Sequence, residues 1–285
     1  MSPNWPPPDV KKLIALAGVA ISVAVLLFGI DFYRHRFVRH NSEIVRLLPP
    51  GDFNLIYADI ELLRRAGLLG LLSNIKVAPD KEYDSFIEQT NFDYMRDLDA
   101  VAVAVDPDQT WLIGRGRFSW DKLRAFALSH QGTCNLELGG CRVPATTPGR
   151  WVIFVSLQPD VLGVVISSNR TVELRVPGRR SLEDIPDAPV WAKLSHVLLA
   201  KPVGLPLPMQ VFAISMQSAD SVLLSAHPDN LQLKARFANS STADTARHQL
   251  EIQTKTLTTS GSLSVIGTDL VGRWPISPEL LKKLQ

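Results

Sequence analysis

The two cysteines of the chain, Cys134 and Cys141, are the residues whose type and spacing point most directly to a chemistry. Gly139 and Gly140 lie between them and can turn a hairpin, which would bring the two β-carbons within bridging distance. The spacing therefore predicts a disulfide, which is typical of proteins from oxidising compartments. Two alternatives stay open: a pair of reduced thiols in a cytosolic domain, or a metal or redox site that includes His130. A structural zinc site normally takes four ligands, and no fourth candidate is near in the sequence.

Carboxylates form a second candidate group, because two aspartates precede and two follow the apolar segment AVAVAV: Asp97, Asp99, Asp106 and Asp108. Paired carboxylates can bind Ca²⁺ or act as general acid and base. A strand of this length would hold the two pairs about 20 Å apart, and the spacing differs from that of a D-x-D-x-D-G calcium loop. Turn and helix-cap roles suit these aspartates better.

Other catalytic patterns are weak. The segment Ser260-Gly261-Ser262 is not a G-x-S-x-G nucleophile elbow, and no phosphate-binding or dinucleotide fingerprint occurs. The remaining histidines are scattered along the chain, at His35, His40, His196, His227 and His248. We therefore assign no catalytic, cofactor-binding or metal-binding residue and expect no cofactor. Whether the protein is an enzyme stays open, and the sequence favours a non-enzymatic role.

The apolar segment from Leu13 to Ile30 is the strongest organising feature of the sequence. It carries no charged residue, and Lys11 and Lys12 precede it while a basic stretch follows it. This length and composition predict a transmembrane helix. No small-residue cleavage site follows the segment, so we expect an uncleaved anchor rather than a signal peptide.

The orientation is decided by the cysteines, because the positive charges on the two sides of the segment are nearly balanced. A disulfide favours a large domain outside the cytoplasm, and we predict a single-pass protein of the inner membrane with a periplasmic domain. The alternative is the inverted topology, in which a cytosolic domain would report to the membrane. A composition of 46% apolar and 20% charged residues supports a folded core. The formal charge of +2 gives no support to nucleic-acid binding.

The fold class that we predict is α+β: an amino-terminal transmembrane helix followed by a duplicated, mainly antiparallel sheet-plus-helix ectodomain. Two pairs of similar segments suggest the duplication. Val190-Trp191-Ala192-Lys193-Leu194 follows the pattern of Ile56-Tyr57-Ala58-Asp59-Ile60, and the pair Arg236-Phe237 follows that of Arg117-Phe118. Within the second unit, residues 211–216 and 221–226 are expected to pair as a hairpin. The predicted divisions are a Pro-rich cytoplasmic tail (1–12), the transmembrane helix (13–33), a juxtamembrane stalk (34–50), and α+β units at 51–180 and 181–285.

Three segments carry a resemblance: the run ADIELLRRAGL that begins at Ala58, residues 92–99 (FDYMRDLD) and residues 272–281 (GRWPISPELL). With these segments the chain resembles a set of uncharacterised bacterial membrane-anchored proteins built from a duplicated α+β domain of unknown function. The resemblance implies a compartment and a fold, but no reaction.

The functional hypothesis is a membrane-anchored periplasmic protein that acts as a non-enzymatic binding module or envelope scaffold. Its expected partners are the lipid bilayer, through the amino-terminal helix, and an envelope protein, but no nucleic acid. The oligomeric state is left open. The alternative from another class is an envelope hydrolase whose site is assembled from residues distant in sequence.

Overall fold

The computed structural model describes residues 40–69, 81–105, 108–135, 140–145, 147–168, 185–200, 207–255 and 261–276. They belong to one compact unit, His40–Gln285, and the other unit, Met1–Arg39, lies outside the described residues. Side chains are described throughout these ranges except at residues 81–85, 207–209 and 253–255.

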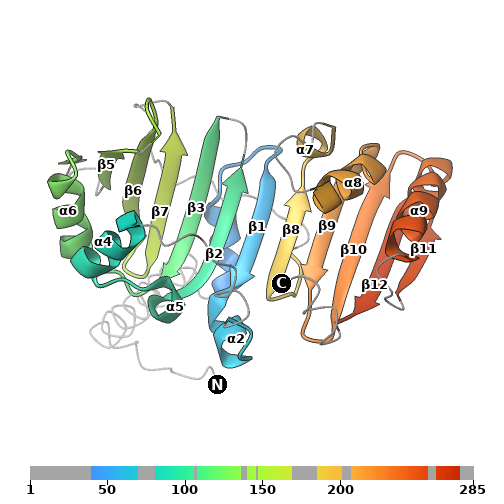
Figure 1. Cartoon of the computed structure of the whole chain (residues 1–285), viewed down its shortest axis with the longest axis horizontal. Coiled ribbons are helices and arrows are strands. Elements are labelled where there is room, and N and C mark those ends of the chain that lie inside the picture. The colour runs from blue at the N-terminus through green and yellow to red at the C-terminus, as the bar shows by residue number, and fades with distance from the viewer. Residues whose placement is uncertain are drawn as a thin grey trace, which may run out of the picture. The chain divides into compact units, whose positions relative to one another are not determined.

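The described unit is built on a 12-stranded sheet in which every pair of neighbouring strands is antiparallel (Figure 1). The first seven strands are β1 (Asn54–Asp59), β2 (Leu98–Val105), β3 (Gln109–Gly116), β4 (Thr133–Asn135), β5 (Gly140–Pro144), β6 (Trp151–Gln158) and β7 (Val161–Ser167). The other five are β8 (Val190–Leu194), β9 (Ala219–Ala226), β10 (Asn230–Phe237), β11 (Ser262–Ile266) and β12 (Asp269–Pro275). Their order across the sheet is β11-β12-β10-β9-β8-β1-β2-β3-β7-β6-β5-β4.

The strand order repeats on the two sides of the β1·β8 pair. Outward from β1 it reads β1-β2-β3-β7-β6, and outward from β8 it reads β8-β9-β10-β12-β11, so the last two strands of each series run in reverse chain order. The first series is extended at its edge by β5 and β4. Because β1 and β8 pair with each other, the two series share one sheet and neither leaves its first strand as an open edge.

The repeat extends to a local irregularity of the backbone. The register shifts by one residue at Asp99 in β2 and at Asp220 in β9, where each strand faces the end of its neighbour. Immediately beyond the shift, the N–H of Gly116 donates to the carbonyl oxygen of Asp160 (2.9 Å), and that of Phe237 donates to Thr268 (3.0 Å). The two halves therefore reproduce the same bulge and the same closing hydrogen bond.

In both halves, the residue directly before the donor of that hydrogen bond is an arginine that makes an ion pair. The Nε of Arg115 lies 3.0 Å from Oδ2 of Asp160, and the Nε of Arg236 lies 3.2 Å from Oδ1 of Asp269. Asp160 lies in the turn between β6 and β7, and Asp269 is the first residue of β12, directly after the turn that follows β11. Both turns are thereby held against the sheet at the place where the register shifts.

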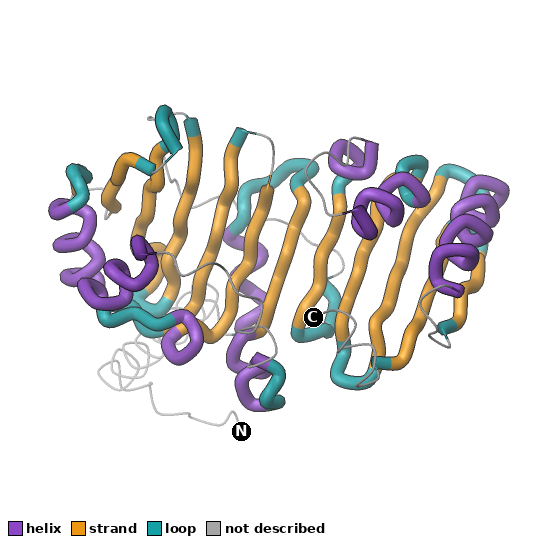
Figure 2. Tube along the Cα trace, in the orientation of Figure 1, coloured by secondary structure: helices purple, strands orange, loops and turns teal. Residues whose placement is uncertain are grey.

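Helices cover one face of the sheet over both halves (Figures 1 and 2). On the first half these are α4 (Lys81–Thr90), α5 (Tyr94–Asp97) and α6 (Trp120–Ser129), with α2 (Ile60–Arg65) at the end of β1. On the second half they are α7 (His196–Ala200), α8 (Leu207–Ser215) and α9 (Ser240–Lys255). The 3₁₀ helix η1 (Asn41–Leu47) lies behind β1 and β2 in the same view.

The apolar core is divided between the two halves. In the second half, Ala243, Ala246 and Leu250 of α9 pack on Leu233 and Phe237 of β10, and all five side chains are buried. This spacing of three and four residues places the apolar side chains of α9 along one stripe. In the first half a smaller cluster lies between α6 and the edge strands, and it contains Leu123, Ala127, Cys141, Val143 and Phe154.

The predicted fold class was wrong. Instead of a transmembrane helix followed by a duplicated sheet-plus-helix ectodomain, the structure has a single large antiparallel sheet with few helices. Among the described residues no helix is long and apolar enough to cross a membrane, and the segment from Leu13 to Ile30 lies outside them. The physical reason for the single sheet is the β1·β8 pairing, which satisfies the backbone groups of both strands.

Two local expectations also differ from the structure. The segment 211–216 was expected as a strand, but residues 211–215 belong to helix α8, because a short apolar run fits either element. Part of the expected stalk, residues 34–50, packs against the sheet as η1, where Ile44 and Val45 are fully buried. The predicted boundary between residues 180 and 181 lies outside the described residues.

Candidate functional site

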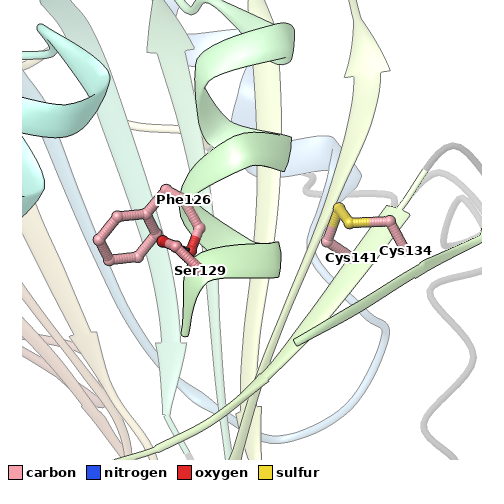
Figure 3. The surroundings of a disulfide bond; sticks show 4 residues. All are labelled: Phe126, Ser129, Cys134 and Cys141. Atoms are coloured by element: carbon pink, nitrogen blue, oxygen red, sulfur yellow. Dashed lines mark hydrogen bonds between the residues drawn. A yellow bond between two sulfur atoms is a disulfide. The ribbon is translucent and has the colours of Figure 1, made fainter. Parts of the chain in front are cut away.

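The disulfide predicted from the sequence is present and joins two neighbouring edge strands. Cys134 of β4 and Cys141 of β5 stand directly opposite each other, with a sulfur–sulfur distance of 2.01 Å (Figure 3). Cys141 is buried and packs in the same cluster as Leu123 and Ala127 of α6. The disulfide therefore fixes the strands on which α6 rests.

A large cavity lies beside this contact, between α6 and the strands β5, β6 and β7. It has a volume of about 1020 Å³, which is at the upper end of the roughly 300–1,000 Å³ that small-molecule sites occupy. Its lining residues are Phe86, Leu123, Phe126, Ser129, His130, Gln131, Val143, Pro144, Ala145, Thr147, Arg150, Val152, Phe154, Leu162, Val164 and Ile166. Most of these are apolar, as in sites that bind apolar ligands.

The floor of the cavity is formed by alternate residues of the sheet. Leu162, Val164 and Ile166 are spaced two apart on β7, and Val152 and Phe154 are spaced two apart on β6. Side chains two residues apart along a strand point to the same face. The register pairs Val164 with Phe154 and Ile166 with Val152, so these side chains form a continuous apolar floor.

Aromatic rings form the wall on the helical side. The rings of Phe86 in α4 and Phe126 in α6 meet edge to face, with centroids 5.1 Å apart. Phe126 also stacks on His130, with centroids 4.1 Å apart. In Figure 3, Phe126 and Ser129 project from α6 on the side away from the disulfide. One side of α6 thus packs on the disulfide-linked strands, and another faces the cavity.

Hydrogen bonds fix the last turn of α6 at the cavity. The hydroxyl of Ser129 donates to the carbonyl oxygen of Phe126 (2.8 Å), and Nδ1 of His130 lies 2.9 Å from the same oxygen. Gln131 follows with a left-handed φ of 59°, which turns the chain into β4. These contacts satisfy the terminal carbonyl of the helix and hold the aromatic wall in one orientation.

The polar lining residues are gathered at one end. Ser129, His130 and Gln131 end α6, while Thr147 and Arg150 belong to the loop between β5 and β6. These two places lie at the same end of the sheet, because β4 starts just after α6 and its Thr133 pairs with Arg142 near the end of β5. The cavity therefore has an apolar body and a polar end.

Arg150 carries the only permanent charge among the described lining residues. The lining contains no other arginine and no lysine, aspartate or glutamate. The loop that carries Arg150 is closed by two backbone hydrogen bonds, from its own N–H to Thr147 (3.1 Å) and from Ala145 to its carbonyl oxygen (2.9 Å). Arg150 is half-buried. A cation carried by a closed loop thus stands at the polar end of an apolar cavity.

The four aspartates singled out in the sequence do not form one site. Asp97 ends α5 just before β2, and Asp99 lies near the start of β2. Asp108 follows the other end of that strand, and Asp106 lies outside the described residues. Asp99 is 3.9 Å from the guanidinium of Arg64, and burial is the main cause that raises its pKa, followed by the charge of Glu61. Within the described parts of the chain, no three metal-ligating side chains gather at one place.

Asp97 has a structural environment. Its carboxylate accepts a hydrogen bond from Nη2 of Arg96 (2.7 Å) and from the backbone N–H of Asp93 (3.0 Å), and lies 3.1 Å from Nη2 of Arg117. The hydrogen bond from Arg96 is the main cause that lowers the pKa of Asp97. These contacts connect α5 to the segment after β3, next to the register shift of β2.

The histidines are spread over the described unit. His196 begins α7, His227 follows β9 and His248 lies in α9, while His130 is the one that lines the cavity. His35 lies outside the described residues, and His40 precedes η1. His130 was considered in the sequence only as a metal ligand beside Cys134, whereas the structure places its ring against Phe126.

The cavity itself was missed by sequence reasoning. Leu123 and Ala127 are spaced four residues apart, as on one face of a helix, and both are buried in the structure. Phe126 and Arg150 gave no signal, because the cavity depends on the pairing of β5, β6 and β7 and on the position of α6 above them. The nearly continuous apolar runs of β6 and β7 were the one available sign of an apolar floor.

Comparisons with known proteins do not assign a family. No family model matches the chain, and no curated protein matches it. Among solved structures, the chain is similar to TP0453 in crystal form I, with a TM-score of 0.47 and 15% sequence identity over 87% of this chain and 97% of that chain. A likeness at this level does not identify a shared function.

Proposed function

We propose that this protein is a non-enzymatic binding protein of the cell envelope, and that the cavity between α6 and β5–β7 holds an elongated apolar ligand. The observation that carries the proposal is the combination of size and lining, a cavity of about 1020 Å³ with an apolar body and a polar end. Burying a methylene group contributes about 0.8 kcal/mol, so a long hydrocarbon chain would gain affinity along the whole cavity.

The envelope location rests on the disulfide and on the sequence. A disulfide between Cys134 and Cys141 persists in oxidising compartments, which supports a domain outside the cytoplasm. The uncharged segment from Leu13 to Ile30 supports attachment to the inner membrane as a single-pass protein. An apolar ligand that partitions into a bilayer would be available to a protein in that position.

The test is photolabelling of the full chain in phosphatidylcholine nanodiscs with hexadecanol that carries a terminal diazirine. We expect label on the peptides that contain Phe126 and Leu162, located by mass spectrometry. The substitution Leu162→Trp should fill the cavity and remove this label. Leu128→Trp is the matched control, because Leu128 lies on the same helix as Phe126 but is 58% exposed.

Two results would contradict the proposal. One is labelling of the wild-type chain that avoids the cavity peptides. The other is equal loss of label in Leu162→Trp and Leu128→Trp, which would show that the cavity is not the place where the chain binds. Far-ultraviolet circular dichroism of both variants checks that each retains the wild-type fold.

A further inference from the structure

The structure points to the chemical class of the ligand: we infer that the cavity binds a single-chain amphiphile with an anionic head, and that Arg150 binds the head. This inference rests on the proposed function, because it concerns the same cavity. It adds a charge and an orientation that an apolar lining alone does not give. The hydrocarbon chain lies over Leu162 and Phe154, and the head faces the loop between β5 and β6.

The first argument is the charge balance of the lining. Arg150 is a permanent cation, and none of the described lining residues is an acid that could neutralise it. Within the described part of the chain, neither an ion pair nor a side-chain hydrogen bond is found for its guanidinium, although other arginines, such as Arg115 and Arg247, pair with acids. A guanidinium presents several N–H donors that match a carboxylate or a phosphate, so an anionic head would complete the site.

The second argument is the orientation of the cavity. Polar side chains occur at the end formed by the last turn of α6 and the β5–β6 loop, and the apolar floor of β6 and β7 extends away from it. Thr147 lies in the same loop as Arg150 and offers a hydroxyl at this end. A ligand with a charged head and a hydrocarbon chain fits this polarity, whereas a hydrocarbon without a head would leave the polar end without a partner.

The third argument is rigidity. The two backbone hydrogen bonds between Ala145, Thr147 and Arg150 hold the loop closed, and the disulfide fixes β5 to β4 below it. A cation on a fixed loop loses less conformational freedom on binding than one on an open segment. The backbone of Arg150 is therefore in place before the ligand arrives.

The experiment compares two photoreactive probes that differ only in the head, palmitic acid and hexadecanol, each with a terminal diazirine. The full chain is labelled in phosphatidylcholine nanodiscs at neutral pH, with unlabelled acid or alcohol as competitor. We expect palmitic acid to compete about tenfold better than hexadecanol for label on the cavity peptides, as for a charge-assisted hydrogen bond.

The variants separate charge from fold. Arg150→Gln should abolish the preference for the acid, because glutamine carries no positive charge to pair with it. Arg150→Lys should retain most of the preference, because the charge remains. Arg273→Gln is the control, because Arg273 is an exposed arginine of β12 in the other half of the sheet and does not line the cavity.

The outcomes distinguish the two levels of the proposal. If both probes label the cavity equally and Arg150→Gln changes neither, the anionic head is excluded while the apolar site stands. If neither probe labels the cavity, the proposed function itself fails. If the acid is preferred but Arg150→Gln and Arg273→Gln both keep that preference, Arg150 is not the group that binds the head.

Discussion

The rings of Tyr57 in β1 and Trp191 in β8 stack across the strand pair that joins the two halves of the sheet, with centroids 5.7 Å apart and an interplanar angle of 28°. The two residues are register partners, and both side chains are buried. Burial raises the pKa of the Tyr57 phenol, with the nearby Asp59 acting in the same direction, so the ring remains neutral at physiological pH. The junction of the halves is therefore a packed aromatic contact.

Trp191→Ala tests how strongly this contact supports the sheet. We expect it to lower the free energy of unfolding by about 3–5 kcal/mol, the usual cost of removing a buried aromatic side chain. Chemical denaturation followed by circular dichroism measures the change. Val197→Ala is the control, since Val197 is 54% exposed, and it should change stability by less than about 0.5 kcal/mol. A Trp191→Ala protein as stable as the control would show that the junction does not depend on the stack.

Asp97→Asn tests the contacts between α5 and the segment after β3. The pKa of Asp97 is lowered in the folded protein, chiefly by Arg96, so its charge stabilises the fold above the ordinary aspartate pKa of about 3.9. That stabilisation disappears as the pH falls through the lower, folded pKa. We therefore expect the variant to be less stable than wild type at pH 7, with a difference that shrinks under acid conditions. Urea denaturation at several pH values measures it, and a difference independent of pH would contradict the assignment.

Reduction of the disulfide should loosen the cavity without unfolding the chain. The bridge closes a short loop, for which the loss of stability is about 2 kcal/mol. Cys141 packs against α6, so we expect the loss to appear as faster hydrogen exchange in α6 and β4, with little change in β9 and β10. The variant carrying both Cys134→Ser and Cys141→Ser should show the same exchange with and without reductant. Equal acceleration over the whole sheet would refute a local role.

Gly116→Ala tests the close approach of two strands at the register shift. A β-carbon at Gly116 would collide with the carbonyl oxygen of Asp97, so we expect destabilisation of about 1–3 kcal/mol. Gly67→Asn is the control, because Gly67 has a left-handed φ of 70° and open space around it, and asparagine tolerates that conformation. Thermal unfolding compares the two. A stable Gly116→Ala protein would mean that the strands separate there at little cost.

The sequence predicted the elements better than their register. The repeat was suggested by two pairs of similar segments, which aligned Trp191 with Tyr57 and Arg236 with Arg117. The strand bounds align Val190 with Asn54, and the matching bulges align Arg236 with Arg115, a slip of two residues in each case. Because side chains in a strand alternate with a period of two, such a slip leaves every residue on its own face and cannot be detected from the pattern.

The cavity and the single sheet could not be predicted for a related reason. The disulfide could be predicted because Cys134 and Cys141 are close in sequence and the hairpin that pairs them is local. The β1·β8 pair joins Tyr57 to Trp191, and the cavity is lined by both Phe86 and Ile166. Both features depend on contacts between distant segments. Local patterns carry no information on which distant strand becomes a neighbour.

The central position of the β1·β8 pair has a consequence for synthesis on the ribosome. β1 is made early, but the strand that covers its second edge is made only after the whole first half has emerged. Until then the nascent first half presents the unpaired backbone groups of β1, and such an edge can pair with other chains. Biogenesis therefore has to protect a strand that in the finished protein lies at the middle of the sheet, and a chain stopped before β8 would be a substrate for aggregation or for holdase chaperones.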